Sequence, residues 1–138
     1  MKAITLWNPY PYLIANGFKK NETRGWATSY RGKIAIHSAK KNDNDIEMIT
    51  RDLIYKLNHR KDIVDVLKMN KEYGCIICTA DLVDCIKITQ GFVNCTASEE
   101  LIVGDYTIGR YAWKLENVRM LDNPVPAKGK QRLWEWKE

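Results

Sequence analysis

The chain has 138 residues, of which 45% are hydrophobic, and this size and composition predict one domain, residues 1–138, around one packed core. No stretch approaches the roughly 18 consecutive apolar residues of a membrane span, and residues 1–6 lack the apolar region of a signal peptide. We therefore expect a cytoplasmic protein that has no membrane partner. Its net charge is a modest +5.

The N-terminal part of the chain begins with extended and then helical patterns. Met1–Trp7 alternates loosely between apolar and polar residues, which predicts a short first strand. Asn8 and Pro9 then predict a helix start, with Asn8 as the cap and Pro9 at the first helical position, and Gly17 ends the helix. The remaining expectations for this part are a polar turn over residues 18–24 and a strand over residues 30–39.

The middle of the chain changes to the period of a helix, because apolar residues recur at spacings of three and four. A helix is predicted from Asn42, with a break near Asn58 and His59 and a second helical stretch that closes near Gly74. The expectations that follow are a strand over Cys75–Cys85, a loop over 89–105, a strand over Tyr111–Met120, an extended connection at Pro124 and Pro126, and a final strand over Leu133–Trp136. This order predicts an α+β domain with a mixed or antiparallel barrel.

The four cysteines raise the alternatives of disulfides or a metal site. They are Cys75, Cys78, Cys85 and Cys95. Without a secretion signal, reduced thiols are expected. Cys75 and Cys78 form a CxxC pair, but residues three apart on a strand point to opposite faces, so their sulfurs would not converge on one metal. We therefore expect no metal site and no cofactor.

Basic residues concentrate at the two ends of the chain. Residues 1–41 hold eight Lys or Arg against the single acid Glu22, and residues 111–138 hold six bases against four acids. Residues 42–110, in contrast, hold eight bases against twelve acids. If the two ends meet in the fold, they form one positive surface suited to a phosphate-bearing partner.

The densest polar cluster lies in residues 17–26. Lys19, Glu22 and Arg24 place two cations and one carboxylate close together along the chain. Such a set can hold a phosphate or polarise a carbonyl while the acid orients a donor. The alternative is that this segment is an ordinary charged turn that is simply solvated.

Several short motifs follow one another along the chain in a characteristic order. They are Leu6-Trp7-Asn8-Pro9-Tyr10, Gly17-x-Lys19-x-x-Glu22-x-Arg24, Tyr30-Arg31-Gly32, the apolar strand that ends at Cys85, Tyr111-Ala112-Trp113, and Lys128-Gly129-Lys130-Gln131. In order and spacing they resemble the ASCH (activating signal cointegrator homology) family, a branch of the PUA-like superfamily. Residues 42–72 carry no motif of that family.

The resemblance implies a PUA-like mixed β-barrel with a short N-terminal helix and inserted helices, and a cleft that binds RNA. Some similar proteins are small amidohydrolases that use a Lys, a Thr and a Glu to remove an acetyl group from acetylcytidine, and a ribonuclease activity has been proposed for other relatives. Lys19 matches that lysine. Glu22 occupies the position of the threonine, and Thr23, one step along an extended segment, would face the other way.

Two hypotheses follow for the function. The first is that one basic cleft binds RNA, single-stranded nucleic acid or a nucleotide-like small molecule, through phosphate contacts and an aromatic side chain that stacks a base. The candidate nucleic-acid-binding residues are Tyr10, Lys19, Arg24, Trp26, Arg31, Lys128 and Lys130. The second is a nucleic-acid or modified-nucleoside hydrolase, either a ribonuclease or an amidohydrolase, in which Lys19 and Glu22 are catalytic.

Three further expectations concern the surroundings of this cleft. The loop Lys128–Arg132 should face the N-terminal motif across the cleft, because both are basic. Trp7, Tyr10 and Trp26 can stack a base or be buried in the core. His37, in an apolar strand, is expected to be a hydrogen-bonded core histidine and not a catalytic base. A third hypothesis assigns the acidic helical region 43–72 to a protein contact.

Overall fold

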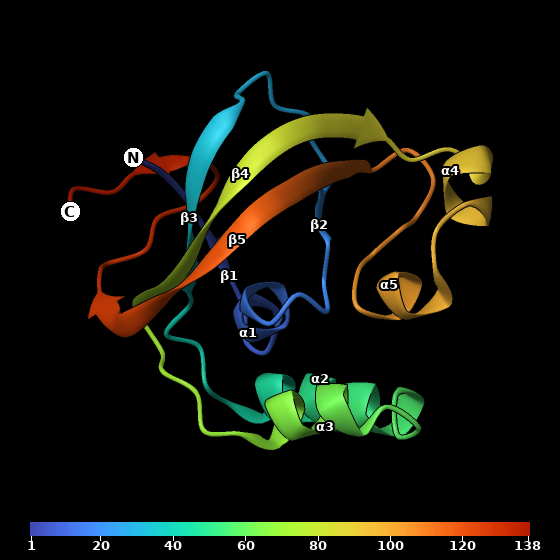
Figure 1. The fold of residues 1–138 in the computed structure, drawn as a ribbon, viewed down its shortest axis with the longest axis horizontal. Helices are drawn as coiled ribbons and strands as arrows, with labels where there is room; N and C mark the ends of the chain where they lie inside the picture. Colours follow the sequence, from blue (N-terminus) through green and yellow to red (C-terminus); the bar gives the residue numbers. More distant parts are fainter.

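A six-stranded sheet dominates the computed structural model, which describes residues 1–138 (Figure 1). Its strand order is β2-β5-β4-β3-β1-β6, in which β1 and β3 run parallel and every other neighbouring pair runs antiparallel. The strands are β1 (Lys2–Leu6), β2 (Asn21–Arg24), β3 (Gly32–Ser38), β4 (Cys75–Lys87), β5 (Tyr111–Pro126) and β6 (Trp134–Glu135). The helices are α1 (Tyr10–Ala15), α2 (Asn44–Lys56), α3 (Lys61–Lys68), α4 (Gln90–Asn94) and α5 (Ser98–Ile102). The predicted α+β class is confirmed.

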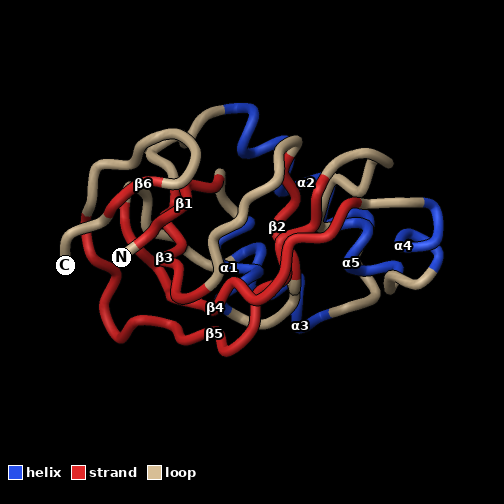
Figure 2. The backbone as a smooth tube through the Cα atoms, turned by 90° about the horizontal axis from the view of Figure 1, so that it is seen from above, coloured by secondary structure: helices blue, strands red, loops and turns tan.

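The sheet is curled, as the view from above shows (Figure 2). Its two longest strands, β4 and β5, pair through three register shifts, and such bulges bend a strand pair and increase its twist. The edge strands β2 and β6 do not pair with each other. The sheet is therefore a curled half-barrel, which is consistent with the mixed β-barrel that the family resemblance implied.

The main core lies between α1 and the strands of the sheet. Ile4 on β1, Ile36 on β3 and Leu82 on β4 are each at most 1% exposed, as their alternation in the sequence predicts. Trp113 on β5 is fully buried among them and Ile14 of α1 packs on the same cluster. This packing holds the end of α1 against the sheet, next to β2.

The predicted helical region 42–74 is confirmed as α2 and α3, which pack on the far side of α1 (Figure 1). The Asp43 side chain caps α2 by accepting from the Asp45 backbone N–H at 3.0 Å, so one of the three suggested cap residues serves that role. The expected break at Asn58 and His59 separates the two helices. No helix of the protein has the length and apolar character needed to cross a membrane.

Two loop predictions are wrong. The expected polar turn over 18–24 ends in strand β2, which pairs antiparallel with β5, because the edge of the sheet offers hydrogen bonds that local composition does not reveal. The expected loop 89–105 contains the short helices α4 and α5. Thr89 caps α4 by accepting from the Phe92 N–H at 3.1 Å, and Tyr106 packs this segment against Ile88 in a small cluster of its own.

Two boundary predictions also need correction. Asn8 does not cap α1, because Pro9 occupies that position and the fully buried Asn8 amide instead donates to the Glu72 carbonyl at 3.5 Å. Pro124 and Pro126 lie inside β5 and not in a connection after it. A long strand tolerates them there because β2 pairs with β5 only as far as Lys114, which leaves the later residues of β5 on an edge.

The four cysteines are free thiols. Cys75 packs with Tyr12 and Ile77, whereas Cys78 lies in the main core, so the two CxxC side chains enter different hydrophobic clusters. Burial raises the pKa of the Cys78 thiol to about 12. No group of three or more His, Cys, Asp or Glu side chains is arranged to hold a metal ion, and the expectation of a metal-free protein stays a prediction.

Candidate nucleic-acid interface

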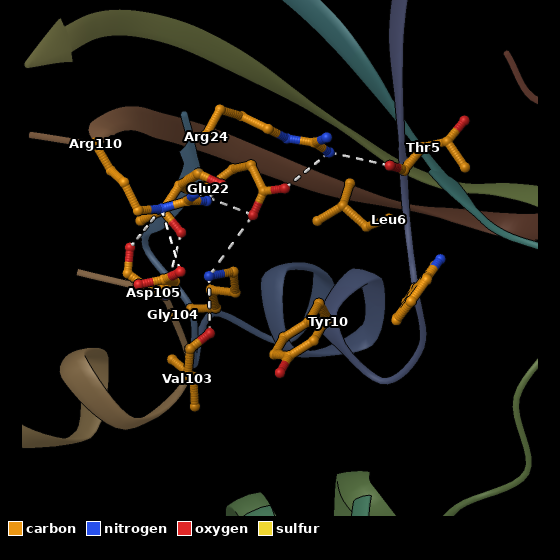
Figure 3. A pocket seen from close by; sticks show the side chains of 12 residues that line it. Thr5, Leu6, Tyr10, Glu22, Arg24, Val103, Gly104, Asp105 and Arg110 are labelled. Carbon is orange, nitrogen blue, oxygen red and sulfur yellow. Dashed lines mark hydrogen bonds and ion pairs between the residues drawn. The ribbon is translucent and has the colours of Figure 1, made fainter. Parts of the chain in front are cut away.

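A pocket of about 410 Å³ opens between β1 and α1 on one side and β2 and the segment after α5 on the other (Figure 3). It brings together residues from three parts of the sequence that lie far apart. They are Thr5, Leu6, Trp7, Tyr10, Lys19, Glu22, Thr23, Arg24, Val103, Gly104, Asp105 and Arg110. Four of the predicted site residues are among them, namely Tyr10, Lys19, Glu22 and Arg24.

The chain reverses sharply at the end of α1 to bring Lys19 into this pocket. Gly17 adopts a φ of 79°, a left-handed conformation that favours glycine. Its N–H donates to the Ile14 carbonyl, and the Phe18 N–H donates to the Leu13 carbonyl, which is the Schellman arrangement of a helix end. The predicted helix stop at Gly17 is confirmed, and the turn there leads to Lys19, two residues further along, which enters the pocket.

Lys19 is only 2% exposed, so the alternative of a solvated turn is wrong for this residue. Its Nζ donates to the Val103 carbonyl at 2.8 Å, lies 3.8 Å from a carboxylate oxygen of Glu22 and is 5.6 Å from the centre of the Tyr10 ring. Burial lowers the pKa of Lys19, while the negative charges of Glu22 and Glu100 act in the opposite direction.

Glu22 and Arg24 lie two residues apart on β2 and therefore share one face of the strand. Arg24 Nη2 donates to Glu22 Oε2 at 2.9 Å and to the Thr5 carbonyl of β1 at 3.0 Å (Figure 3). Arg24 Nε is buried and has no hydrogen-bond partner. Glu22 thus orients Arg24, and the guanidinium connects β2 with β1 across the pocket.

The opposite wall comes from residues that sequence reasoning did not select. Gly104 packs so closely that a Cβ there would lie 2.7 Å from the Tyr106 ring and 3.2 Å from Lys19 Nζ. Arg110 Nη2 donates to the Thr23 carbonyl at 3.2 Å, while its Nε donates to the Asp105 carbonyl, also at 3.2 Å. The Gly-Asp pair at 104–105 was a visible turn signal, but nothing local indicated that it lies against Lys19.

Thr23 does not take the place of the missing threonine of the amidohydrolase set. Its hydroxyl oxygen accepts from the Asp105 N–H at 3.2 Å, and both residues belong to the pocket lining. Lys19 forms its hydrogen bond with Val103 instead. The pocket therefore offers no observation in favour of the hydrolase hypothesis.

The aromatic residues divide into two groups. Tyr10 lines the pocket, and so does Trp7, which is 47% exposed and has Lys41 Nζ 4.9 Å from its ring centre. Trp26 lies elsewhere: it packs edge-on against Trp113, and Arg132 covers its ring at 4.0 Å. Trp7 is therefore an exposed aromatic residue at the pocket, whereas Trp26 lies outside the pocket lining.

Three of the predicted cations do not line the pocket. Arg31 is exposed and donates to the Thr28 and Tyr30 carbonyls. Lys128 and Lys130 line a separate hollow beside β6. In the Lys128–Arg132 loop, Gly129 lies close to the pocket residue Thr5, and a Cβ there would lie within 2.9 Å of both the His37 ring and the Thr5 hydroxyl. The structure does not bring Lys128 and Lys130 into the same pocket as Lys19, so this prediction is wrong.

His37 is the hydrogen-bonded core histidine that the sequence predicts, at 1% exposed. Its Nε2 lies 2.7 Å from the Ala127 carbonyl, which can only accept, so Nε2 carries the proton and Nδ1 accepts from the Thr5 hydroxyl at 3.2 Å. The Thr5 hydroxyl in turn accepts from Trp134 Nε1 at 3.1 Å. This chain of bonds holds the segment leading to β6 against β1.

The His37 network predicts a loss of stability in mild acid. Burial lowers the pKa of His37 from its ordinary 6.5, so the unfolded chain binds more protons than the folded one and stability falls as the pH drops below about 6.5. Thermal unfolding between pH 5 and pH 8 should show this decline in the wild type. His37→Gln keeps a donor for Ala127 without titrating, so its profile should be flatter; equal profiles would contradict the assignment.

The comparisons with known proteins agree with this architecture. The model of the ASCH domain family matches residues 4–125, which includes all or most of every strand except β6, and the whole pocket. Two proteins named activating signal cointegrator 1, from Mus musculus and Homo sapiens, are each 22% identical over 134 residues. The alignment covers 96% of this chain but only 22% of each relative, so the chain spans about a fifth of their length. This protein belongs to the ASCH family.

Proposed function

We propose that the protein binds single-stranded RNA by taking one unpaired nucleotide into the pocket between β1, α1, β2 and the segment after α5. The observation that carries the proposal is the convergence of two cations, Lys19 and Arg24, beside the exposed ring of Trp7. The volume of about 410 Å³ lies in the range of roughly 300–1,000 Å³ that is usual for small-ligand sites. An unpaired nucleotide, unlike a base pair in a duplex, can leave its stack and enter such a pocket.

The free donors of the pocket indicate which atoms a ligand should present. Lys19 has three N–H donors and uses one on the Val103 carbonyl, while Arg24 uses Nη2 on Glu22 and Thr5 and leaves Nη1 without a protein acceptor. A ligand rich in acceptors, with phosphate or keto oxygens, satisfies such donors through charge-assisted hydrogen bonds. Nucleotides carry both kinds of oxygen.

Trp7 supplies the second element of recognition. Stacking of a base on an aromatic side chain stabilises single-stranded complexes by about 1–3 kcal/mol and tolerates any base, because every base has a π face. Lys41 Nζ lies 4.9 Å from the centre of the Trp7 ring and pairs with Asp43 at 2.6 Å and with Asp45 at 3.1 Å, so its charge is already shared with two carboxylates. Membership of the ASCH family, which is linked to RNA binding, and a PUA-like assignment of the half-barrel both support a nucleic-acid partner.

Fluorescence anisotropy with a short labelled RNA tests the proposal. The wild type should bind the single strand more tightly than the matching duplex, with a slope of log affinity against log salt of about −0.7 for each phosphate contacted. Trp7→Ala should weaken binding by about 10-fold or more, the equivalent of 1.4 kcal/mol. Tyr55→Ala removes an aromatic side chain that is 79% exposed on α2 and serves as the control. Equal effects of the two substitutions, or no RNA binding, would refute the proposal.

A further inference from the structure

A buried carboxylate lies directly behind the pocket without lining it. Glu100, on α5, is 7% exposed, whereas its neighbour Glu99 has a side chain that is 37% exposed. A buried carboxylate is stable only where several donors or a positive charge compensate for its lost hydration. The groups that donate to Glu100 therefore indicate which part of the protein this buried carboxylate stabilises.

Those partners belong to the segment that carries Lys19. Glu100 Oε1 accepts from the Lys20 N–H at 2.7 Å, and Oε2 accepts from the Asn21 N–H at 3.4 Å and from the Tyr106 hydroxyl at 2.8 Å. The Asn21 amide donates in turn to the Tyr106 hydroxyl oxygen at 3.1 Å. One carboxylate thus fixes two consecutive backbone N–H groups, and these follow Lys19 immediately.

The residues after α5 complete the enclosure of the Lys19 side chain. Val103 accepts from Nζ through its carbonyl, and the absence of a side chain at Gly104 leaves room for the ammonium group. The short helix therefore acts on Lys19 twice, through the backbone by way of Glu100 and through the side chain by way of Val103.

Charge gives Glu100 a second effect. The titratable groups that face Lys19 are Tyr10 from α1, Glu22 and Arg24 from β2, and Glu100 from α5. Burial lowers the pKa of Lys19 and so does Arg24, whereas both carboxylates raise it. A neutral Lys19 amine would lose its attraction for an anionic oxygen. The two carboxylates therefore favour the charged form of Lys19, which is the form that binds such an oxygen.

We propose that Glu100 is a positioning residue of the pocket, which holds Lys19 in place and keeps it positively charged for a ligand oxygen. The role of the ligand rests on the proposed function, but the effect of Glu100 on Lys19 is a property of the free protein. It can therefore be measured without RNA.

The test is NMR of the free protein with ¹³C-labelled lysine, in which Lys19→Met assigns the Lys19 signal. Glu100→Gln should shift the titration of Lys19 to lower pH and speed amide hydrogen exchange at Lys20 and Asn21. Glu99→Gln, one residue away on the same helix but at the surface, should change neither. In RNA binding, Glu100→Gln should move the loss of affinity at high pH to a lower pH, and this shift should vanish when Lys19 is also replaced by methionine.

Glu100→Asp keeps the charge but shortens the side chain, and it provides a second variant if Glu100→Gln does not fold. It should speed exchange at Lys20 while the Lys19 titration stays close to that of the wild type. Unchanged Lys19 titration with Gln, or unchanged exchange at Lys20 with Asp, would overturn the proposal. If the Lys19 titration moves as expected but no variant binds RNA, the proposed function fails and the role of Glu100 stands.

Discussion

Replacing Glu22 with alanine is expected to lower the free energy of unfolding by about 3 kcal/mol, because it leaves two cations of the pocket without their carboxylate. Glu22 Oε2 accepts from Arg24 at 2.9 Å, and Oε1 accepts from the Thr23 N–H at 3.2 Å and lies near Lys19. Lys19 is buried and Arg24 retains 24% exposure, so the value belongs at the lower end of the about 3–5 kcal/mol seen for broken buried pairs.

Urea unfolding measures this change, and Glu116→Ala is the matched control. Glu116 lies on β5 with a side chain that is 56% exposed, 3.8 Å from Lys114, and exposed pairs of this kind contribute about 0–1 kcal/mol. A Glu22→Ala variant as stable as Glu116→Ala would show that Glu22 is not the electrostatic centre of the pocket.

The neutral variant Glu22→Gln tests the effect of Glu22 on RNA binding separately from its effect on the stability of the fold. Glutamine retains an acceptor for Arg24 but adds a donor and removes the charge. If Glu22 only balanced charge, this variant would bind RNA equally well or slightly more tightly. Since Glu22 orients Arg24 in the pocket, we expect weaker binding with the fold preserved.

Replacing Lys19 with methionine is expected to lower the affinity for single-stranded RNA by about 10- to 100-fold. A hydrogen bond to a charged group contributes about 1.5–3 kcal/mol, and 1.4 kcal/mol corresponds to a factor of ten. Methionine preserves the length of the apolar stem, so the packing near Tyr10 and Gly104 can remain. If the ligand atom is a phosphate oxygen, the salt slope should also decrease by about 0.7.

Lys20→Met is the control for this substitution, because Lys20 is the next residue and its side chain is exposed. Both variants lose one positive charge at almost the same place. Anisotropy titrations at two salt concentrations, with circular dichroism to confirm folding, should therefore separate a general charge effect from a pocket contact. Equal losses of affinity would mean that Lys19 contributes only through long-range attraction and does not contact the RNA.

Much of the fold follows from local patterns. The alternation around Ile34 and Ile36 predicts β3, and the apolar run after Gly74 predicts β4, because apolar residues are concentrated where an element is buried. The helical period of residues 42–74 predicts α2 and α3 for the same reason. The stop of α1 at Gly17 was equally visible, because glycine readily adopts the left-handed conformation.

The motif Gly17-x-Lys19-x-x-Glu22-x-Arg24 also identified three of the twelve residues that line the pocket. Three charged residues at these spacings, together with Tyr10, do line one site. The sequence could not rank the aromatic residues, however. The tertiary structure distinguishes them, because Trp7 lines the pocket while Trp26 packs against Trp113 beneath Arg132.

Local sequence patterns therefore predict the α+β class, most of the secondary structure, the family resemblance and the N-terminal motif of the pocket. The folded chain is needed to see that Lys19 is buried, that Glu100 and Val103 surround it, and that Lys128 and Lys130 lie in another hollow. The cause is distance along the chain, because the Val103 carbonyl that accepts from Lys19 is 84 residues away. Apolar periodicity and turn residues act locally, whereas the burial of a charge depends on which distant groups the folded chain brings to it.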